Sequence, residues 1–353
     1  MPNNSSKNAA KPPVISVCIP TYNRIHFLRQ LINSIIATVN GLGGKVEVVI
    51  SDNCSTDGTR QFLDGLENND YVCRNHNETN LGPLKNGAKC LELANGDYIW
   101  FVGDDDIITP TGLLHALKRI EEYPQIDYFL VNTIPLGNSN RKDIETICKD
   151  SLYINNYKTK FDSKLDRYVE SFNEFIDPEF DPLFLGAMMC NIIRRSIWAE
   201  GITTIDLNAK TGTLHGTYCT ISILARHMPG KASYYIGFPC TLAFWGHQPW
   251  QSYLPIIDAY TVYAMLDEYE KFGVEQWRIE KCQRFSHKKG AKAILKLNLI
   301  VNTPGRYLFS TKNFLIRYWR HKELWMGFIK GIFSALFNVI KRLFDNIVPN
   351  KAW

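Results

Sequence analysis

Short apolar runs alternate with segments of helical periodicity over the first 130 residues of this chain. Runs rich in β-branched residues that end at Pro, Gly or Asp are typical of buried strands. Strands that alternate with helices predict an α/β fold with a mostly parallel, doubly wound sheet and right-handed crossovers. The expected strands are residues 14–19, 46–50, 71–74, 98–102, 128–131, 187–193 and 234–244, and later helices are expected at 110–123, 255–272 and 276–300.

Polar side chains follow three of these strands at the point where each strand ends. They are Thr21, Tyr22, Asn23, Asp52 and the acidic triplet 104–106. In an open α/β sheet, ligands bind at the carboxyl ends of the strands. We therefore expect these residues to outline a binding pocket, with the less regular segment 137–182 forming loops and a lid over it.

The acidic triplet 104–106 is the strongest single feature. Adjacent carboxylates at a strand end repel one another unless a cation or hydrogen-bond donors compensate. Mg²⁺ prefers one or two carboxylates together with phosphate oxygens, so one reading is a divalent ion that also holds a diphosphate. The other reading is a helix N-terminus that Asp106 caps ahead of Pro110. The sequence contains neither a P-loop nor a Gly-x-Gly-x-x-Gly after the first strand, which argues against P-loop phosphoryl transfer.

Asp52 and the tripeptide Asn80-Leu81-Gly82 also allow two readings. A carboxylate at the end of the second strand can accept hydrogen bonds from a nucleobase or ribose, or it can close an Asx-turn that leads into the next helix. We expect Ser55 or Thr56 to cap that helix. Asn80 is either a ligand contact or a cap of the following helix.

Taken together, four motifs resemble the family-2 glycosyltransferases of the GT-A fold, over about residues 14–130. The first is the opening strand and loop Ile15-Ser16-Val17-Cys18-Ile19-Pro20-Thr21-Tyr22-Asn23-Arg24. The others are Ser51-Asp52-Asn53-Cys54-Ser55-Thr56-Asp57-Gly58-Thr59, Asn80-Leu81-Gly82 with Asn86-Gly87, and Gly96-Asp97-Tyr98-Ile99-Trp100-Phe101-Val102-Gly103-Asp104-Asp105-Asp106. Within the family, the chain is most similar to bacterial transferases of dideoxyhexoses such as abequose.

This resemblance implies a nucleotide-sugar donor whose sugar is moved to a hydroxyl of a glycan acceptor. It assigns the donor to Pro20, Thr21, Tyr22, Asn23, Arg24, Asp52, Asn80, Lys85 and Asp104. It makes Asp105 a ligand of Mg²⁺ or Mn²⁺, joined by Asp104 and by His247. The family often has Asp-x-Asp where this chain has Gly103-x-Asp105, so one carboxylate of the usual pair is missing. His247 can equally be a histidine packed between aromatic rings.

Inversion at the anomeric carbon requires a general base. Family members usually supply it from an acidic pair at the start of a helix, and residues 212–218 contain no such pair. The candidates are His215, which as a neutral histidine can accept a proton, and Asp206. Asp177, Glu179 and Asp181 can also reach in from the lid. His215 can instead be a capping residue or orient the acceptor.

Charge is distributed unevenly along the chain. Residues 284–353 contain 14 Lys and Arg against 2 Asp and Glu, whereas residues 1–283 contain 26 against 33. Trp325, Phe328, Ile329, Ile332, Leu336, Val339, Ile340, Leu343 and Ile347 recur at helical spacing, with Arg317, Arg320 and Lys322 upstream. The pattern is typical of a basic amphipathic helix on a membrane surface; the alternative is a helix docked on the catalytic domain or on a second subunit. Its aromatic residues share one helix face, which does not favour nucleic acid as a partner.

The nine cysteines form no Cys-x-x-Cys pair, which indicates reduced thiols rather than a disulfide framework or a zinc site. Residues 1–13 are polar and do not resemble a signal peptide, and no uncharged stretch reaches the length of a membrane span. We therefore expect a cytoplasmic protein, peripheral on the cytoplasmic face of the inner membrane, where a lipid-linked acceptor would be presented.

The expected organisation is a disordered leader (1–13), a catalytic domain (14–250), a helical region (251–312) and a basic amphipathic extension (313–353). Within the catalytic domain, residues 14–135 would bind the nucleotide sugar and residues 136–250 the acceptor. Two other functions remain open. A sugar nucleotidyltransferase would need a Gly-rich basic loop after the first strand, unlike residues 21–24. A non-catalytic nucleotide-sugar or glycan-binding scaffold would explain the absent acidic pair.

Overall fold

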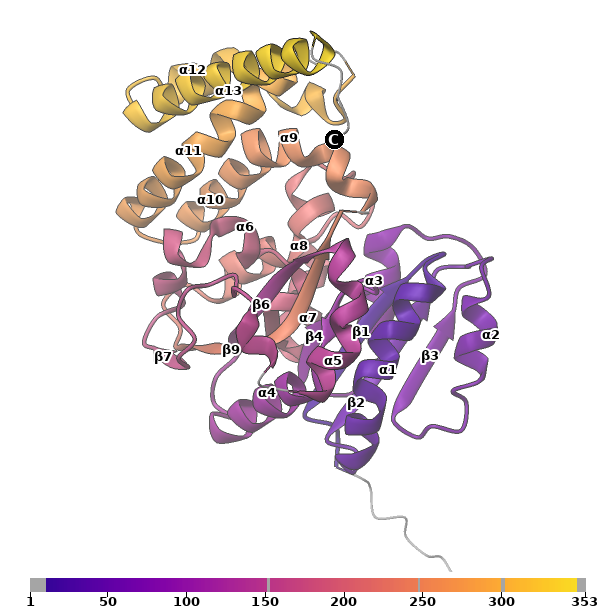
Figure 1. Ribbon diagram of the computed structural model, residues 1–353. Coiled ribbons are helices and arrows are strands. Elements are labelled where there is room, and N and C mark those ends of the chain that lie inside the picture. Colours follow the sequence, from indigo (N-terminus) through magenta and orange to yellow (C-terminus); the bar gives the residue numbers. More distant parts are fainter. Residues whose placement is uncertain (1–10, 151–152, 247, 300–301, 348–353) are drawn as a thin grey trace, which may run out of the picture.

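The chain folds around one nine-stranded sheet with helices on both faces, as the computed structural model shows (Figure 1). The structure describes residues 11–150, 153–246, 248–299 and 302–347. Most of the predicted leader and His247 therefore lie outside the described residues. The strand order is β3-β2-β1-β4-β8-β6-β9-β5, and β7 also pairs with β9. The strands are β1 (Ile15–Thr21), β2 (Val46–Asp52), β3 (Val72–His76), β4 (Tyr98–Phe101), β5 (Ile107–Ile108), β6 (Tyr128–Gly137), β7 (Arg167–Val169), β8 (Asn191–Arg194) and β9 (Ser233–Trp245).

Strands β3, β2, β1 and β4 are parallel, and their side chains feed two separate cores. Ile15, Val17 and Ile19 of β1 pack in the core on one face, while Cys18 packs in the core on the other. Successive side chains of a strand point to opposite faces. A strand with helices on both faces is therefore apolar along its whole length, which is why the β1 run was readable from sequence.

The second half of the sheet is mixed rather than parallel. Strand β8 is antiparallel to both β4 and β6, whereas β6 and β9 are parallel. The expected strand 187–193 begins later than predicted, because residues 188–190 form a 3₁₀ turn. The reason for the reversal is topological: β6 ends at the carboxyl edge, the segment from 138 to 190 stays off the sheet apart from β7, and β8 then runs back from that edge.

Among the described residues before 300, eleven α-helices cover the sheet and continue beyond it (Figure 1). They include short helices within the segment that was expected to form loops. The bounds are α1 (Ile25–Gly41), α2 (Thr59–Asp64), α3 (Pro83–Leu93), α4 (Pro110–Glu122), α5 (Ile144–Lys149), α6 (Pro182–Leu185), α7 (Arg195–Gly201), α8 (Leu214–His227), α9 (Leu254–Ile256), α10 (Val262–Lys271) and, running up to residue 299, α11 (Gln276–Leu299). A π-helix at residues 257–261 joins α9 to α10.

The predicted cap of α2 is wrong. The helix begins at Thr59 behind Gly58, which has φ 90° and no side-chain cap. Ser55 and Thr56 are instead bound to Asn23: the Asn23 N–H donates to Ser55 Oγ (2.8 Å), and the Thr56 N–H donates to Asn23 Oδ1 (2.7 Å). Ser55 and Thr56 therefore join the turn after β2 to the turn after β1 and do not cap α2.

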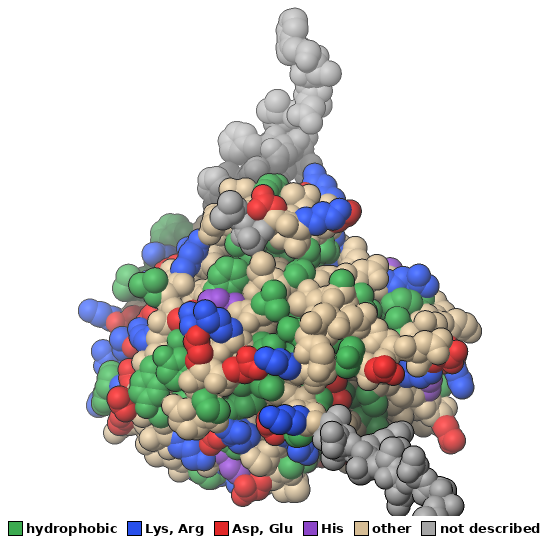
Figure 2. Space-filling model, turned by 90° about the horizontal axis from the view of Figure 1, so that it is seen from below, with side chains coloured by type: hydrophobic (Ala, Val, Ile, Leu, Met, Phe, Trp, Pro, Cys, Tyr) green, Lys and Arg blue, Asp and Glu red, His purple; other side chains and the backbone are tan. Residues whose placement is uncertain are grey.

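Two C-terminal helices, α12 (Thr311–Tyr318) and α13 (Lys322–Ile347), lie at the top of Figure 1. Helix α13 packs on α11, and the Asn298 side-chain amide of α11 donates to the Thr311 hydroxyl of α12 (3.1 Å). Phe314, Tyr318 and Leu324 are buried. Among the described residues no helix is long and apolar enough to pass through a bilayer. On the face seen from below, acidic and basic side chains lie interspersed (Figure 2).

A buried histidine holds the turn between α12 and α13 to α11. His287 Nδ1 is 3.0 Å from the Tyr263 hydroxyl, and His287 Nε2 is 2.8 Å from His321 Nδ1. His287 is fully buried. Burial, and secondarily His321, lower the pKa of His287 to about 4.

Acid is expected to destabilise the protein through this histidine. In the unfolded chain, a histidine with a pKa near 6.5 binds a proton that folded His287 rejects, so stability is complete above about pH 6.5 and falls as the pH is lowered toward 4. In His287→Gln, the slope of unfolding free energy against pH in this window should decrease by up to about 1.4 kcal/mol per pH unit. Denaturant titrations at several pH values measure it; an unchanged slope would contradict the assignment.

Candidate active site

The carboxyl ends of β1, β2 and β4 lie side by side and gather most of the predicted donor residues. Thr21 is in register with Asp52. The Thr21 hydroxyl donates to Asp104 Oδ2 at 2.8 Å, which joins the end of β1 to the acidic loop that follows β4. The sheet thus brings together side chains that are 83 positions apart in sequence.

The acidic loop, residues 103–106, is buried. Asp104, Asp105 and Asp106 are 4, 7 and 6% exposed. Burial, opposed by Arg24 and reinforced by Asp105, raises the pKa of Asp104 to about 6. Burial, and next the Asp105 carboxylate, raise the pKa of Asp106 well above its usual value. Three buried carboxylates repel one another, so a positive charge placed beside them would stabilise the loop.

Asp106 does not cap α4. Its Oδ1 accepts a hydrogen bond from the Phe244 N–H of β9 (3.2 Å). The N-cap is Thr109, whose hydroxyl oxygen accepts from the Gly112 N–H. The capping alternative for the acidic triplet is therefore wrong, and Asp106 anchors the loop to the far half of the sheet.

Arg24 partly neutralises the acidic loop. Its Nη1 lies 2.8 Å from Asp104 Oδ1 and 3.2 Å from Asp105 Oδ2. Burial alone would lower the pKa of Arg24, but the two carboxylates outweigh it and the pKa is raised. Arg24 was predicted to contact the nucleotide-sugar donor, and in the structure it contacts Asp104 and Asp105, two other predicted site residues.

Arg141 is a second cation at this loop, and the sequence reasoning missed it. Its Nη2 donates to the main-chain oxygen of Asp105 (2.6 Å), and its guanidinium lies between the rings of Phe27 (4.2 Å) and Phe244 (4.1 Å). Burial lowers the pKa of Arg141, against the pull of Asp105 and Asp106. Its position soon after a strand was the one sequence signal that could have indicated this role. Strand β6 runs to Gly137, six residues beyond its predicted end, so residue 141 comes shortly after the carboxyl end of that strand.

Gly103 stands where the family often has an aspartate, and the neighbouring carboxylates occupy that space. A Cβ atom at Gly103 would lie 2.8 Å from Asp105 Oδ1 and 3.2 Å from Asp106 Oδ2. The two oxygens therefore approach the same point beside the loop. Oxygen donors of this kind suit a hard divalent ion, which needs few carboxylates when diphosphate oxygens complete its shell. The donor set fits Mg²⁺ or Mn²⁺ with Asp105 as a ligand.

Asp52 forms the Asx-turn that was one of the two roles predicted for it. It is 1% exposed; its Oδ1 accepts from the Ser55 N–H (3.1 Å), and its Oδ2 lies 3.3 Å from His76 Nδ1. Asn80 behaves similarly, since its Oδ1 accepts from the Gly82 N–H (2.9 Å) without capping α3. Asn53, which was not singled out, donates to Asn80 Oδ1 (2.9 Å) and joins the two turns.

The remaining donor candidates lie around this edge. Pro20 is the penultimate residue of β1, and Asn23 has a positive φ of 53°. Tyr22 is 44% exposed, and Lys85 in the first turns of α3 is also exposed. Exposed side chains at the mouth of a polar edge remain available to a ligand.

The two base candidates lie together. The Asp206 N–H donates to His215 Nδ1 at 3.2 Å, so a neutral His215 carries its proton on Nε2. The Asp206 carboxylate is exposed and accepts from the Asn208 N–H (2.9 Å). His215 does not cap α8, which is capped by Thr213.

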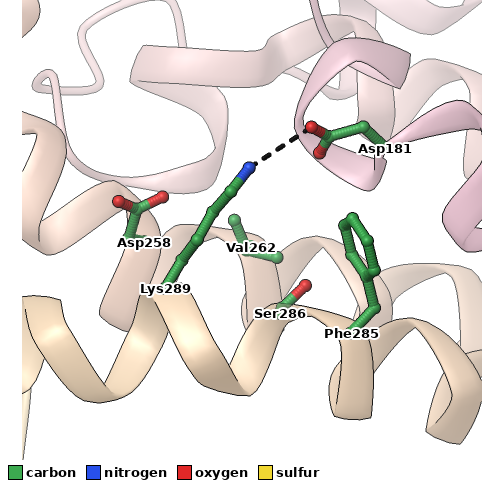
Figure 3. A pocket seen from close by; sticks show the side chains of 6 residues that line it. All are labelled: Asp181, Asp258, Val262, Phe285, Ser286 and Lys289. Atoms are coloured by element: carbon green, nitrogen blue, oxygen red, sulfur yellow. Dashed lines mark hydrogen bonds and ion pairs between the residues drawn. The ribbon is translucent and has the colours of Figure 1, made fainter. Parts of the chain in front are cut away.

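The lid carboxylates are paired with cations. Asp177 binds Lys281, and Glu179 Oε2 lies 3.5 Å from Arg167 Nη2. Asp181 accepts from Lys160 (2.7 Å) and Lys289 (3.3 Å) and lines a cavity of about 10 Å³, into which Asp258 of the π-helix also faces (Figure 3). Burial would raise the pKa of Asp181, but Lys160 and Lys289 outweigh it and the pKa is lowered. A carboxylate that favours its charged form is a weak proton acceptor.

His247 cannot be tested as a metal ligand, because it lies outside the described residues. In the described part of the chain, the acidic loop included, no three His, Cys, Asp or Glu side chains are grouped so that they could hold a metal ion by themselves.

Comparison with known proteins finds a family match over part of the chain. Residues 16–176 match the sequence model of Glycosyl transferase family 2. Abequosyltransferase RfbV of Salmonella typhimurium is 35% identical over 165 residues, which are 44% of this chain and 46% of that protein. The chain thus matches less than half the length of this curated relative. The predicted resemblance to family-2 glycosyltransferases and to abequose transferases is confirmed.

Solved structures confirm the fold. Staphylococcus aureus TarS 1-349 in complex with UDP-GlcNAc superimposes with a TM-score of 0.52 at 18% identity, over 89% of each chain. Mannosyltransferase PcManGT from Pyrobaculum calidifontis, in complex with GDP-Man and Mn²⁺, gives 0.51 at 13% identity, over 92% of this chain and 88% of that one. The α/β GT-A architecture with a helical C-terminal region, as predicted, is therefore correct.

Proposed function

With residues 16–176 matching glycosyl transferase family 2, we propose that the chain transfers a sugar from a nucleotide-sugar donor to a glycan hydroxyl in bacterial surface polysaccharide synthesis. The observation that carries the proposal is the buried acidic loop at the carboxyl edge of β4, joined to Thr21 and Arg24 of the opening motif. Those groups lie within the matched residues, at the edge where α/β sheets bind nucleotides.

The donor half, residues 14–135, would bind the nucleotide sugar. Thr21, Tyr22 and Asn23 would line the nucleotide, with Asp52 near the base and Asp104 near the ribose, while Asn80 and Lys85 would lie along the same edge. Asp105 would hold Mg²⁺ or Mn²⁺, with Asp104 and His247 as further candidate ligands. When bound, the ion supplies Lewis-acid neutralisation of the charge that develops on the departing diphosphate.

Arg24 and Arg141 complement that chemistry from the protein side. Arginine presents a planar fork of donors that matches phosphate oxygens. Arg141 holds the acidic loop through the Asp105 main chain, so the carboxylate is fixed before the donor arrives. Fixed dipoles and charges stabilise a transition state without reorganising during the reaction.

The acceptor half, residues 136–250, would supply the general base for an inverting reaction. We propose that the base belongs to the pair His215 and Asp206. Proton acceptance at His215 Nε2 requires the ring proton to move to Nδ1, which breaks the bond from the Asp206 N–H. The Asp206 carboxylate needs no such change, so the two roles are separable by mutation.

We further propose that the acceptor is lipid-linked and that the C-terminal extension lies on the cytoplasmic face of the inner membrane. Ile329, Ile332 and Phe333 of α13 are 55, 49 and 68% exposed. Ile329 and Ile332 line an apolar groove of about 440 Å³ between α11, α12 and α13, and Arg320, Lys322 and Lys330 are close to them in sequence. Apolar area flanked by basic residues binds anionic bilayers.

Substitution of the exposed row tests this surface without removing its buried part. Deleting residues 313–353 would expose the core that Phe314 and Tyr318 fill. In Ile329→Ser/Ile332→Ser, binding to liposomes with anionic lipids should weaken about tenfold or more, because each change removes apolar area from the contact. Cosedimentation measures it, with Leu165→Ser, another exposed position, as the control. Unchanged binding would contradict the membrane proposal, and a dimer that the substitution dissociates would favour docking on a second subunit.

Release of nucleoside diphosphate from a panel of nucleotide sugars, with acceptor and with or without EDTA, tests the function. A transferase releases nucleoside diphosphate, and chelation should stop a metal-dependent one. Pyrophosphate-dependent formation of nucleoside triphosphate would indicate the nucleotidyltransferase alternative. Donor binding without turnover across the panel would indicate the scaffold.

A further inference from the structure

Arg24 occupies the position that a cation needs. Its Nη1 lies between Asp104 Oδ1 (2.8 Å) and Asp105 Oδ2 (3.2 Å), at the mouth of the acidic loop. The two carboxylates are nearly buried, whereas the Arg24 side chain retains 23% of its exposure. One positive group already satisfies the oxygens that the proposed function assigns to Mg²⁺ or Mn²⁺.

A guanidinium and a divalent ion cannot share these oxygens at contact distance. Two such cations a few ångströms apart repel each other strongly in a site with little water. An ion that takes Asp104 Oδ1 or Asp105 Oδ2 as a ligand therefore requires the Arg24 guanidinium to leave that oxygen. Its departure frees the Nη1 donors, which then need a new acceptor.

Resting on the proposed function, we infer that Arg24 and the divalent ion exchange places: Arg24 neutralises Asp104 and Asp105 when no ion is bound and moves to the diphosphate when the ion binds. A diphosphate brings oxygens that match the arginine fork. The exchange makes ion binding weak without the diphosphate and strong with it, so the empty enzyme does not retain the ion.

Arg141 is fixed where Arg24 is free to turn. Its guanidinium is stacked between Phe27 and Phe244 and donates to Gln30 Oε1 (2.8 Å), Asn138 Oδ1 (2.8 Å) and the Asp105 carbonyl (2.6 Å). Leaving would break contacts with groups that no incoming ion replaces. Arg24 gives up carboxylate contacts, which the ion takes over, and a longer contact with the Phe27 ring (5.8 Å). The two arginines thus have different roles, one mobile and one positional.

The test measures two affinities that should change in opposite directions in Arg24→Gln. Titration of the protein with MnCl₂ alone, followed by electron paramagnetic resonance, should show about tenfold tighter Mn²⁺ binding than the wild type, because the competing charge is gone. Calorimetric titration with magnesium pyrophosphate in excess Mg²⁺ should show about tenfold weaker binding, because an arginine contact to phosphate is lost. Arg29→Gln, an exposed position in α1, is the matched control and should change neither.

Three results would overturn the exchange. Mn²⁺ affinity in Arg24→Gln that equals or falls below the wild type would show that Arg24 does not compete. An equal gain in Arg141→Gln would reduce the effect to loss of nearby charge, with no exchange at the carboxylates. Absence of Mn²⁺ binding in the wild type, with and without pyrophosphate, would overturn the metal part of the proposed function as well, and circular dichroism separates each result from misfolding.

Discussion

Replacing Asp105 by asparagine should reduce sugar transfer about 10³-fold and weaken Mn²⁺ binding at least about tenfold. The substitution keeps the shape of the side chain but removes the charge that a hard cation requires. By the resemblance to the family, Asp105 is the residue of the loop expected to match the metal ligand, since Gly103 stands in place of the other aspartate. Its main-chain oxygen still accepts from Arg141, so the loop should keep its position.

Asp97→Asn is the matched control for this experiment. Asp97 is an exposed aspartate immediately before β4, at the opposite end of the strand that leads to the acidic loop. The control should retain wild-type turnover and Mn²⁺ affinity. If Asp105→Asn also retains both, the acidic loop is not a metal site and the proposed mechanism is wrong.

Replacing His215 by alanine should lower kcat about 10²-fold and leave the KM for the donor nearly unchanged. A general base acts on the acceptor hydroxyl in the transition state and makes no contact with the nucleotide. The His227→Ala variant changes a histidine at the other end of α8 and should retain activity. Steady-state kinetics with varied donor and saturating acceptor measure both parameters.

Asp206→Asn decides between the two members of the pair. If the Asp206 carboxylate is the base, kcat should fall about 10²-fold in Asp206→Asn and much less in His215→Ala. The His215 change would then remove only a side chain that accepts a hydrogen bond from the Asp206 N–H. Full turnover in both variants would exclude the pair and leave the base to the lid or to a side chain outside the described residues.

The central strands and the acidic loop were predictable because their signals are local. A strand covered on both faces is an unbroken apolar run, and the polar residues that end it follow directly in sequence, as Asp104 follows 98–102. The reversal of β8 was not predictable, because strand direction depends on where the preceding lid leaves the chain. The apolar pattern of a buried strand is the same in either direction.

The missed contacts are long-range. Nothing near Asp106 indicates that it binds the Phe244 N–H instead of capping α4, and nothing near Arg141 indicates that it meets the Asp105 carbonyl. The Asx-turn predicted for Asp52 is present. The helix cap predicted for Ser55 or Thr56 is not, because Asn23 from another turn binds both residues instead. Local rules rank the options, and tertiary partners choose between them.

The anchors on the acidic loop bear on how this enzyme class can be engineered. The aspartates proposed to hold the ion come from the amino-terminal half, yet two of the anchors on their loop, Arg141 and the main chain of β9, are encoded in the downstream half. A chimaera joined near residue 135 that takes its acceptor specificity from another transferase would inherit foreign anchors and lose ion affinity together with turnover. Swapping specificity therefore calls for carrying residues 138–141 and 244 along with the donor module, so that the module travels with its own supports.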